Sequence, residues 1–225
     1  MNKIKTAKFL FLIFLTAGLV SCQTGKKMNG PKVTATTVYE EKFNENMKEH
    51  PNDFFVMDGT FIIRKLGKNY ALHLVPRPLK TYGCLFGPEI KGDLIVSADI
   101  FAGKSGRTIP TFGVGTNGLA GFRLYIRAAR TGTVIQIVYN EVQVVASAEY
   151  PDWMNESWTS MKLYVKRTGE EVEVYGKAWP KDKEESDWQV SYKGKLELDE
   201  GQASFWGIPY SGRDIFFDNL KIEKP

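Results

Sequence analysis

The chain has 225 residues, of which 30 are basic and 26 acidic. Three of the lysines precede residue 22, so the rest of the chain carries 27 basic residues against 26 acidic ones. This near-neutral balance excludes the strong positive charge that is typical of nucleic-acid-binding proteins, and no nucleic acid is expected as a partner. Two cysteines and two histidines exclude a cysteine-rich zinc site.

Residues 1–21 have the parts of a signal peptide. Lysines at positions 3, 5 and 8 form a positive n-region, and the apolar run 9–20 is too short to span a bilayer. The sequence Leu19-Val20-Ser21-Cys22 resembles the lipobox of bacterial lipoproteins. The resemblance implies cleavage before Cys22 and acyl chains such as palmitate on that residue, which anchor a protein stably to a membrane. An ordinary secretory signal with an incidental cysteine is the alternative.

Residues 22–32 are polar, contain Gly and Pro, and show no periodicity, which predicts a flexible tether. Gln23 stands where many lipoproteins of the inner membrane have Asp, so the outer membrane is the expected location. Residues 33–225 are predicted to form one domain, because no further linker interrupts them. Cys84 has apolar neighbours and no partner once Cys22 carries lipid, which predicts a buried, inert thiol.

Alternation of apolar and polar residues, with many β-branched and aromatic side chains, recurs through the domain. The predicted strands are 61–63, 70–75, 93–101, 122–128, 133–139, 142–146, 161–166, 171–175 and 215–222. No segment after Cys22 predicts a helix of three turns. The run 113–118 matches G-x-G-x-x-G, but a strand-like segment follows it, so we expect a glycine-rich connection and no nucleotide site. These patterns indicate an all-β fold of two packed antiparallel sheets.

The last predicted strand has one polar residue on an apolar face. With regular alternation, Asp218 shares a face with Phe216, Leu220 and Ile222. A carboxylate buried there needs hydrogen-bond donors or a cation. Backbone amides are one solution, and calcium, which prefers oxygen ligands, is the other.

The run 158–166 (WTSMKLYVK), the hairpin after it and the closing run 214–222 (DIFFDNLKI) resemble the concanavalin A-like jelly roll. This superfamily includes legume lectins, laminin G-like modules and laminarinase-type glycoside hydrolases. The resemblance implies a jelly-roll sandwich, and it implies a structural calcium at Asp218. The 3-keto-disaccharide hydrolase domains share this plan. Residues 201–209 here depart from them, because the His of their Gly-His-Ile-Gly-Leu-Gln-like motif is absent.

The carboxylate pair of a glycoside hydrolase is not evident. The Glu-x-Asp-x-x-Glu spacing of laminarinase-type enzymes is absent. Glu171 and Glu173 share a face, but they alternate with valines as on a solvated strand. A divergent hydrolase would need carboxylates from separate strands, for which Asp99, Glu141 and Glu173 are candidates. We therefore expect no catalytic residue.

Aromatic residues in predicted loops favour carbohydrate binding, because sugars offer apolar faces to rings and hydroxyl groups to polar side chains. Trp206, Tyr210 and Arg213 are predicted to contact glycan, and Trp179 is a further candidate. Trp158 is expected in the core. Three arginines and an aromatic residue are expected to share one sheet face: Arg107, Arg123, Arg127 and Tyr125.

The sequence thus predicts a membrane-anchored, extracytoplasmic lipoprotein whose β-sandwich binds carbohydrate without catalysis. Two alternatives stay open, namely a divergent glycoside or 3-keto-disaccharide hydrolase and a structural lipoprotein that binds another protein. A groove with exposed aromatic residues favours the first function, a deep pocket with paired carboxylates the second, and a flat apolar patch the third.

Overall fold

The computed structural model describes residues 30–225 except 46, 48, 78, 79, 105, 197 and 211. The predicted signal peptide, Cys22 and Gln23 lie outside the described residues, so the lipid anchor stays a prediction. The described part of the chain forms fifteen strands. It contains no helix, and therefore none that is long and apolar enough to cross a membrane.

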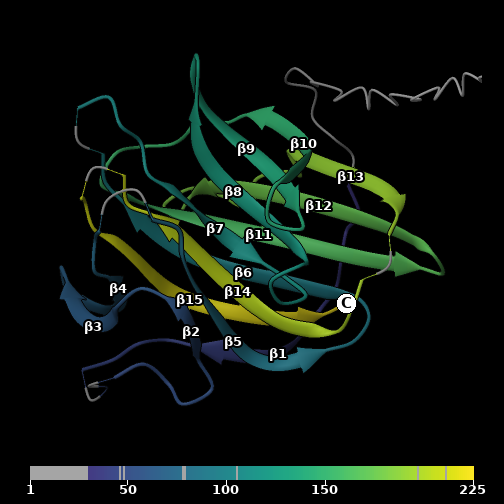
Figure 1. Cartoon of the computed structure of the whole chain (residues 1–225), viewed down its shortest axis with the longest axis horizontal. Coiled ribbons are helices and arrows are strands. Elements are labelled where there is room, and N and C mark those ends of the chain that lie inside the picture. The colour runs from purple at the N-terminus through teal and green to yellow at the C-terminus, as the bar shows by residue number, and fades with distance from the viewer. Residues whose placement is uncertain are drawn as a thin grey trace, which may run out of the picture.

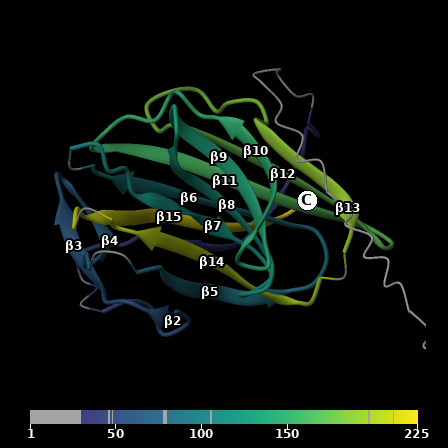
Figure 2. The same ribbon diagram turned by 45° about the horizontal axis from the view of Figure 1, so that its top comes forward.

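The strands form two antiparallel sheets, which lie as two layers in Figure 1. One sheet has eight strands: β1 (Thr36–Glu41), β3 (Phe61–Leu66), β4 (Asn69–Leu74), β6 (Leu94–Ala102), β11 (Ser157–Thr168), β12 (Glu171–Pro180), β13 (Val190–Lys195) and β15 (Ile215–Lys224). Their order is β13-β12-β11-β6-β15-β4-β3, and β1 pairs with β15. Figure 2 shows β11, β6 and β15 side by side in this layer.

The other sheet has seven strands: β2 (Phe55–Asp58), β5 (Tyr82–Ile90), β7 (Thr111–Gly115), β8 (Phe122–Ala129), β9 (Gly132–Tyr139), β10 (Gln143–Glu149) and β14 (Gly201–Ile208). Their order is β10-β9-β8-β7-β14-β5-β2. The core lies between the two sheets and is built from alternate positions. In β11, for example, Met161, Leu163 and Val165 are fully buried in it, whereas Lys162 lies on the outer face. The predicted all-β sandwich of two antiparallel sheets is confirmed.

Glycine occupies the centre of the seven-stranded sheet. Gly113 and Gly115 lie within β7, so the prediction of a glycine-rich connection over 113–118 is wrong for 113–115; residues 116–118 do lie in the connection to β8. A Cβ atom on Gly113 would lie 1.9 Å from the carbonyl oxygen of Leu124, and one on Gly115 would lie 2.5 Å from Oγ of Ser204. The close approach of the neighbouring strands therefore requires glycine at these two positions.

A β-bulge interrupts β15. Asp218 is paired with Asp99 of β6, and Lys221 is paired with Ser97, so β15 carries one residue more than β6 between these pairs. Asn219 lies within the bulge with a φ of 49°, in the left-handed region that Asn tolerates better than most residues.

The bulge changes which side chains of β15 reach the core. Its core-facing residues are Ile215, Phe217, Leu220 and Ile222. Phe216 and Asp218 lie on the outer face of the eight-stranded sheet. The prediction that Asp218 shares a face with Leu220 and Ile222 is wrong, because the bulge ends the regular alternation at Asn219.

The first described residues lie against this outer face. A Cβ atom on Gly30 would meet Cδ1 of Trp188 at 2.0 Å, and Nε1 of Trp188 donates a hydrogen bond of 3.1 Å to the carbonyl oxygen of Pro31. Val33 and Ala35 pack on a small apolar cluster that includes Trp188. Residues 30–35 therefore cover one end of the outer face.

Candidate functional site

Aromatic side chains form a row across the outer face of the eight-stranded sheet. Trp158, Phe101, Phe216 and His73 are successive cross-strand partners on β11, β6, β15 and β4. Neighbouring ring centroids lie 5.8, 5.9 and 4.6 Å apart along this order. We call these four residues the aromatic row. The prediction that Trp158 is a core residue is wrong, because β11 turns its odd-numbered residues to the core.

Asp99 joins polar side chains beside the aromatic row. Ser160 Oγ donates a hydrogen bond of 2.5 Å to Oδ1 of Asp99, and Nδ2 of Asn219 donates one of 2.7 Å to Oδ2. Nζ of Lys181 lies 2.7 Å from the same Oδ2 and 5.1 Å from the ring centroid of Trp158. We call Asp99, Ser160, Lys181 and Asn219 the Asp99 cluster. It brings together a carboxylate, a hydroxyl, an ammonium and an amide; Asp99 and Ser160 are buried, Lys181 is exposed and Asn219 is partly exposed.

Trp179 borders the Asp99 cluster. It is the cross-strand partner of Ser160, and its side chain is partly buried. Trp158 is also partly buried, and its ring lies beside Nζ of Lys181. Of the four residues predicted to contact glycan, Trp179 is therefore the one on this surface.

Trp206 lies in β14, so its expected place in or beside a loop is wrong. Its indole is covered, since the guanidinium carbon of Arg123 lies 3.5 Å from the ring centroid and the residue is 5% exposed. Nε1 donates a hydrogen bond of 2.8 Å to Oγ of Ser204. Beneath the ring, a Cβ atom on Gly83 would lie 2.3 Å from Cζ3 of Trp206. Trp206 thus packs against the outer face of the seven-stranded sheet and presents no open ring.

Tyr210 and Arg213 lie at two different places, and the surroundings of both differ from those of Trp206. Tyr210 lines a hollow of about 480 Å³ together with Arg107 and Arg127. Arg213 forms an ion pair with Glu156. The three neighbours in sequence that were expected to contact one glycan are therefore not brought together.

The predicted arginine face is present in part on the seven-stranded sheet, because Arg107 lies in a turn before β7. Arg123, Tyr125 and Arg127 point outward from β8, whose intervening residues lie in the core. Nη1 of Arg123 donates a hydrogen bond of 3.4 Å to the Tyr125 hydroxyl, and the guanidinium of Arg127 lies 5.6 Å from the same ring. Arg127 lies over the ring and Arg123 contacts its hydroxyl; Tyr125 is buried, which leaves little of the ring for a ligand.

Backbone amides hold the carboxylate of Asp218. Its Oδ1 accepts a hydrogen bond of 2.8 Å from the amide of Asn219, and the amide of Phe43 donates a second one. Burial raises the pKa of this carboxyl above its usual value. Among the described residues, no group of three or more His, Cys, Asp or Glu side chains could hold a metal ion. The amides are one of the two solutions predicted for Asp218, and calcium there stays a prediction.

The carboxylates considered for a divergent hydrolase lie apart. Asp99 is at the centre of the outer face, whereas Glu141 follows β9 in the other sheet. Glu171 and Glu173 both lie on β12 and share a face, as predicted. Nζ of Lys193 lies 3.0 Å from a carboxylate oxygen of Glu171 and 3.2 Å from one of Glu173. These glutamates are therefore part of a surface ion-pair network.

Cys84 is fully buried, as predicted. Burial raises the pKa of its thiol to about 12. A thiol with such a pKa carries almost no thiolate at neutral pH, so Cys84 is inert as a nucleophile.

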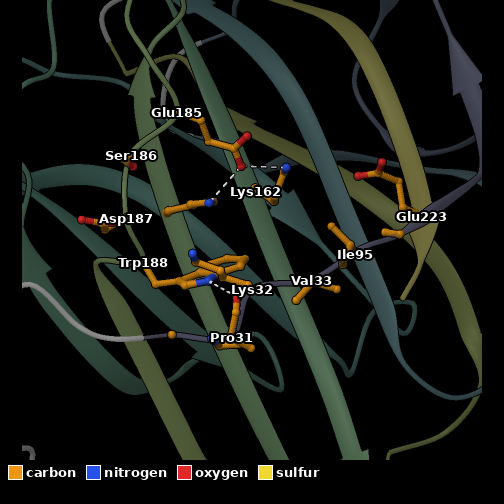
Figure 3. Close-up of a pocket in the computed structure, with 13 residues that line it drawn as sticks. Pro31, Lys32, Val33, Ile95, Lys162, Glu185, Ser186, Asp187, Trp188 and Glu223 are labelled. Atoms are coloured by element: carbon orange, nitrogen blue, oxygen red, sulfur yellow. Dashed lines mark hydrogen bonds and ion pairs between the residues drawn. The ribbon is translucent and has the colours of Figure 1, made fainter.

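A pocket of about 730 Å³ opens at the end of the outer face that residues 30–35 cover (Figure 3). Its walls come from β6, β11, β12, β15, the loop after β12 and the first described residues. We call it the Trp188 pocket, after the indole on its floor. Its charged residues are Lys32, Lys162, Lys177, Glu185, Asp187 and Glu223. The loop that carries Glu185 reads in the sequence as an ordinary solvated surface, so no signal marks the pocket.

Sequence reasoning finds neither the aromatic row nor the Asp99 cluster as a unit. Their members come from four strands and a loop, and Asn219 reaches Asp99 because of the bulge. One signal was available for Trp158. It is four residues from Lys162 and three from Met161 in the same strand, so alternation places it on the outer face with Lys162.

No protein-family model and no curated protein sequence matches the chain. Solved structures match its fold. The carbohydrate recognition domain of Emp47p aligns with a TM-score of 0.57 and 11% identity, over 86% of this chain and 98% of that one. Lectin I-B4 from Griffonia simplicifolia aligns with a TM-score of 0.57 and 9% identity, over 83% of this chain and 100% of that one. The carbohydrate-binding module CBM66 from Bacillus subtilis aligns with a TM-score of 0.52 and 14% identity, over 80% of this chain and 98% of that one. At these identities the likeness shows the fold alone, and it confirms the predicted concanavalin A-like jelly roll.

Proposed function

We propose that this protein binds carbohydrate, without catalysing a reaction, on the outer face of its eight-stranded sheet. One observation carries the proposal: Trp158 and Trp179, both partly exposed, each lie beside a member of the Asp99 cluster. Indole rings stack on the apolar faces of sugars, and the ammonium of Lys181 and the amide of Asn219 are the groups of the cluster that reach the surface to hydrogen-bond the hydroxyl rim. The lectins and the binding module named above share the fold and support the same function.

The arrangement of carboxylates supports binding rather than hydrolysis. Asp99 already accepts bonds from Ser160, Asn219 and Lys181. Asp218, its cross-strand partner, is bonded to two backbone amides. Glycoside hydrolysis needs one carboxyl group free to give a proton and a second to act on the sugar or on water. Neither of these two carboxyl groups is free for such a role.

A glycan array with the detergent-purified protein and two variants tests the proposal. Trp179→Ala is expected to lower the affinity for the bound glycan roughly tenfold, because one stacking platform is lost. Trp206→Ala removes an indole that is covered by Arg123, so the fraction that remains folded should keep the affinity. If the native protein binds no glycan across a broad array, the proposal is overturned. It is also overturned if folded Trp206→Ala loses binding while Trp179→Ala binds as tightly as the native protein.

The proposal includes a lipid anchor on Cys22 and attachment to the outer membrane, with the sandwich in the cell envelope. It also includes calcium at Asp218, which is expected to stabilise the fold. Thermal unfolding with calcium and with EDTA tests that part. A rise of Tm with calcium that Asp218→Asn abolishes would support it, and equal Tm values for the native protein in both buffers would contradict it.

A further inference from the structure

Two ammonium groups meet one carboxylate in the Trp188 pocket. Nζ of Lys162 lies 2.8 Å and Nζ of Lys177 lies 2.9 Å from the same oxygen, Oε1 of Glu185. Figure 3 shows Glu185 directed from its loop toward Lys162 on the sheet. The exposed fraction of the side chain is 11% for Lys177 and 23% for Lys162, but 45% for Glu185. The lysines are therefore fixed in the sheet, whereas the carboxylate comes from an exposed loop.

The lysine pair is suited to hold an anion. Nζ of Lys177 also lies 4.3 Å from the ring centroid of Trp188, which favours one position for the ammonium. Burial alone would raise the pKa of Glu185, but the hydrogen bonds from Lys162 and Lys177 outweigh it and lower the pKa. Glu185 is therefore ionised at neutral pH, and its single negative charge faces two ammonium groups.

The other labelled acidic residues of the pocket are not directed toward Lys162 in Figure 3. Glu223 lies across the pocket on β15, where its Oε1 is 2.7 Å from Nζ of Lys221. Asp187 points away from Glu185 and Lys162 in Figure 3. Lys32 adds a further positive charge to the lining.

The lysine pair lies one step along the strands from the proposed carbohydrate site. Lys162 follows Ser160 by two residues on β11, and Lys177 precedes Trp179 by two residues on β12. Two residues of a strand span about 6.6 to 6.8 Å, a distance that adjoining units of one sugar chain bridge. We propose, on the premise of the carbohydrate site above, that the ligand is an acidic glycan whose carboxylate or sulfate group displaces Glu185 from Lys162 and Lys177.

Matched pairs of ligands test this with the full chain purified in detergent. Oligogalacturonate and its methyl ester differ in the carboxylate charge, and heparin oligosaccharides and their desulfated forms differ in the sulfate. The acidic member of one pair is expected to bind about tenfold more tightly than its neutral counterpart, and added salt should reduce the difference. A preference within the galacturonate pair would identify the anionic group as a carboxylate, and a preference within the heparin pair would identify it as a sulfate.

Variants of the pocket sharpen the test. Glu185→Gln removes the competing carboxylate and should raise the affinity for the acidic ligand roughly fivefold, with the neutral ligand unchanged. Lys162→Gln should lower the acidic affinity by a similar factor. Glu184→Gln and Lys183→Gln make the same charge changes on exposed neighbours in the same loop and are expected to have little effect.

Each outcome decides the matter. If Glu185→Gln does not raise the acidic affinity above that of Glu184→Gln, or if the neutral members bind as tightly as the acidic ones, the acidic-ligand proposal is overturned while the carbohydrate site stands. If no member of either pair binds and the glycan array is silent, both proposals fail. Because Glu185 and Lys162 are partly exposed, thermal unfolding should show that both variants fold.

Discussion

Trp206 and Trp179 are side chains of one kind in opposite surroundings. Trp206 lies between the guanidinium of Arg123 and the space above Gly83, whereas Trp179 is partly exposed. Truncation of a buried aromatic side chain leaves a cavity and costs about 3 to 5 kcal/mol. We therefore expect Trp206→Ala to lower the free energy of unfolding by that amount, and Trp179→Ala by about 1 kcal/mol or less. Urea unfolding of both variants measures the two costs, and equal costs would contradict the assignment.

His73 is a second residue whose surroundings set a testable property. Burial lowers its pKa below the ordinary value of 6.5, although the hydrogen bond to Asp214 acts in the other direction. Its ring is 2% exposed and stacks on Phe216 at 4.6 Å. The unfolded chain therefore takes up a proton at His73 at a higher pH than the folded protein does. Stability should fall as the pH drops below 6.5, until the folded protein also binds the proton.

Comparison of the native protein with His73→Asn measures this contribution. Urea midpoints at several pH values between 5 and 7.5 are expected to fall more steeply toward low pH in the native protein than in the variant. The difference between the two proteins cancels the titration of the carboxyl groups that they share. Parallel curves would show that His73 has the same pKa in both states.

The bulge in β15 is the element on which the Asp99 cluster depends. Asn219 has a φ of 49° and donates from Nδ2 to Asp99. Asn219→Gly keeps the backbone conformation accessible and loses one hydrogen bond, at a cost of about 1 kcal/mol. Asn219→Val also forces a β-branched residue into the left-handed region, at a further cost of about 1 to 3 kcal/mol. Urea unfolding that ranks valine equal to or above glycine would contradict this account of the bulge.

Strands with regular alternation can be predicted from the sequence, and irregular ones cannot. The hairpins β3-β4, β9-β10 and β11-β12 have clear patterns, and the structure contains each of them. β7 has glycine at positions where neighbouring strands approach closely, so its pattern carries no signal. The bulge at Asn219 is likewise absent from any pattern of period two. The Asp99 cluster depends on the bulge through Asn219, so it could not be predicted from alternation.

At the scale of the whole molecule, the two outer faces have different characters. The face of the seven-stranded sheet has its aromatic rings covered by arginines, whereas the face of the eight-stranded sheet has partly open indoles, the Asp99 cluster and the Trp188 pocket. The first described residues cover one end of the second face. The described chain therefore begins at one end of the proposed binding face, eight residues after the predicted anchor.

This short separation makes the lipid anchor a testable part of the proposed function. From Cys22 to Gly30 the chain spans eight residues, or at most about 29 Å. A lipid on Cys22 would thus keep the Trp188 end of the binding face within that distance of the membrane surface. We expect the native protein in the outer-membrane fraction of a bacterial host, and Cys22→Ser in the soluble fraction. Cys84→Ala, which removes the other cysteine, should stay in the membrane, and Gln23→Asp should shift the protein toward the inner membrane. Membrane retention of Cys22→Ser, or a soluble native protein, would show that the anchor is absent and that the binding face is free of this constraint.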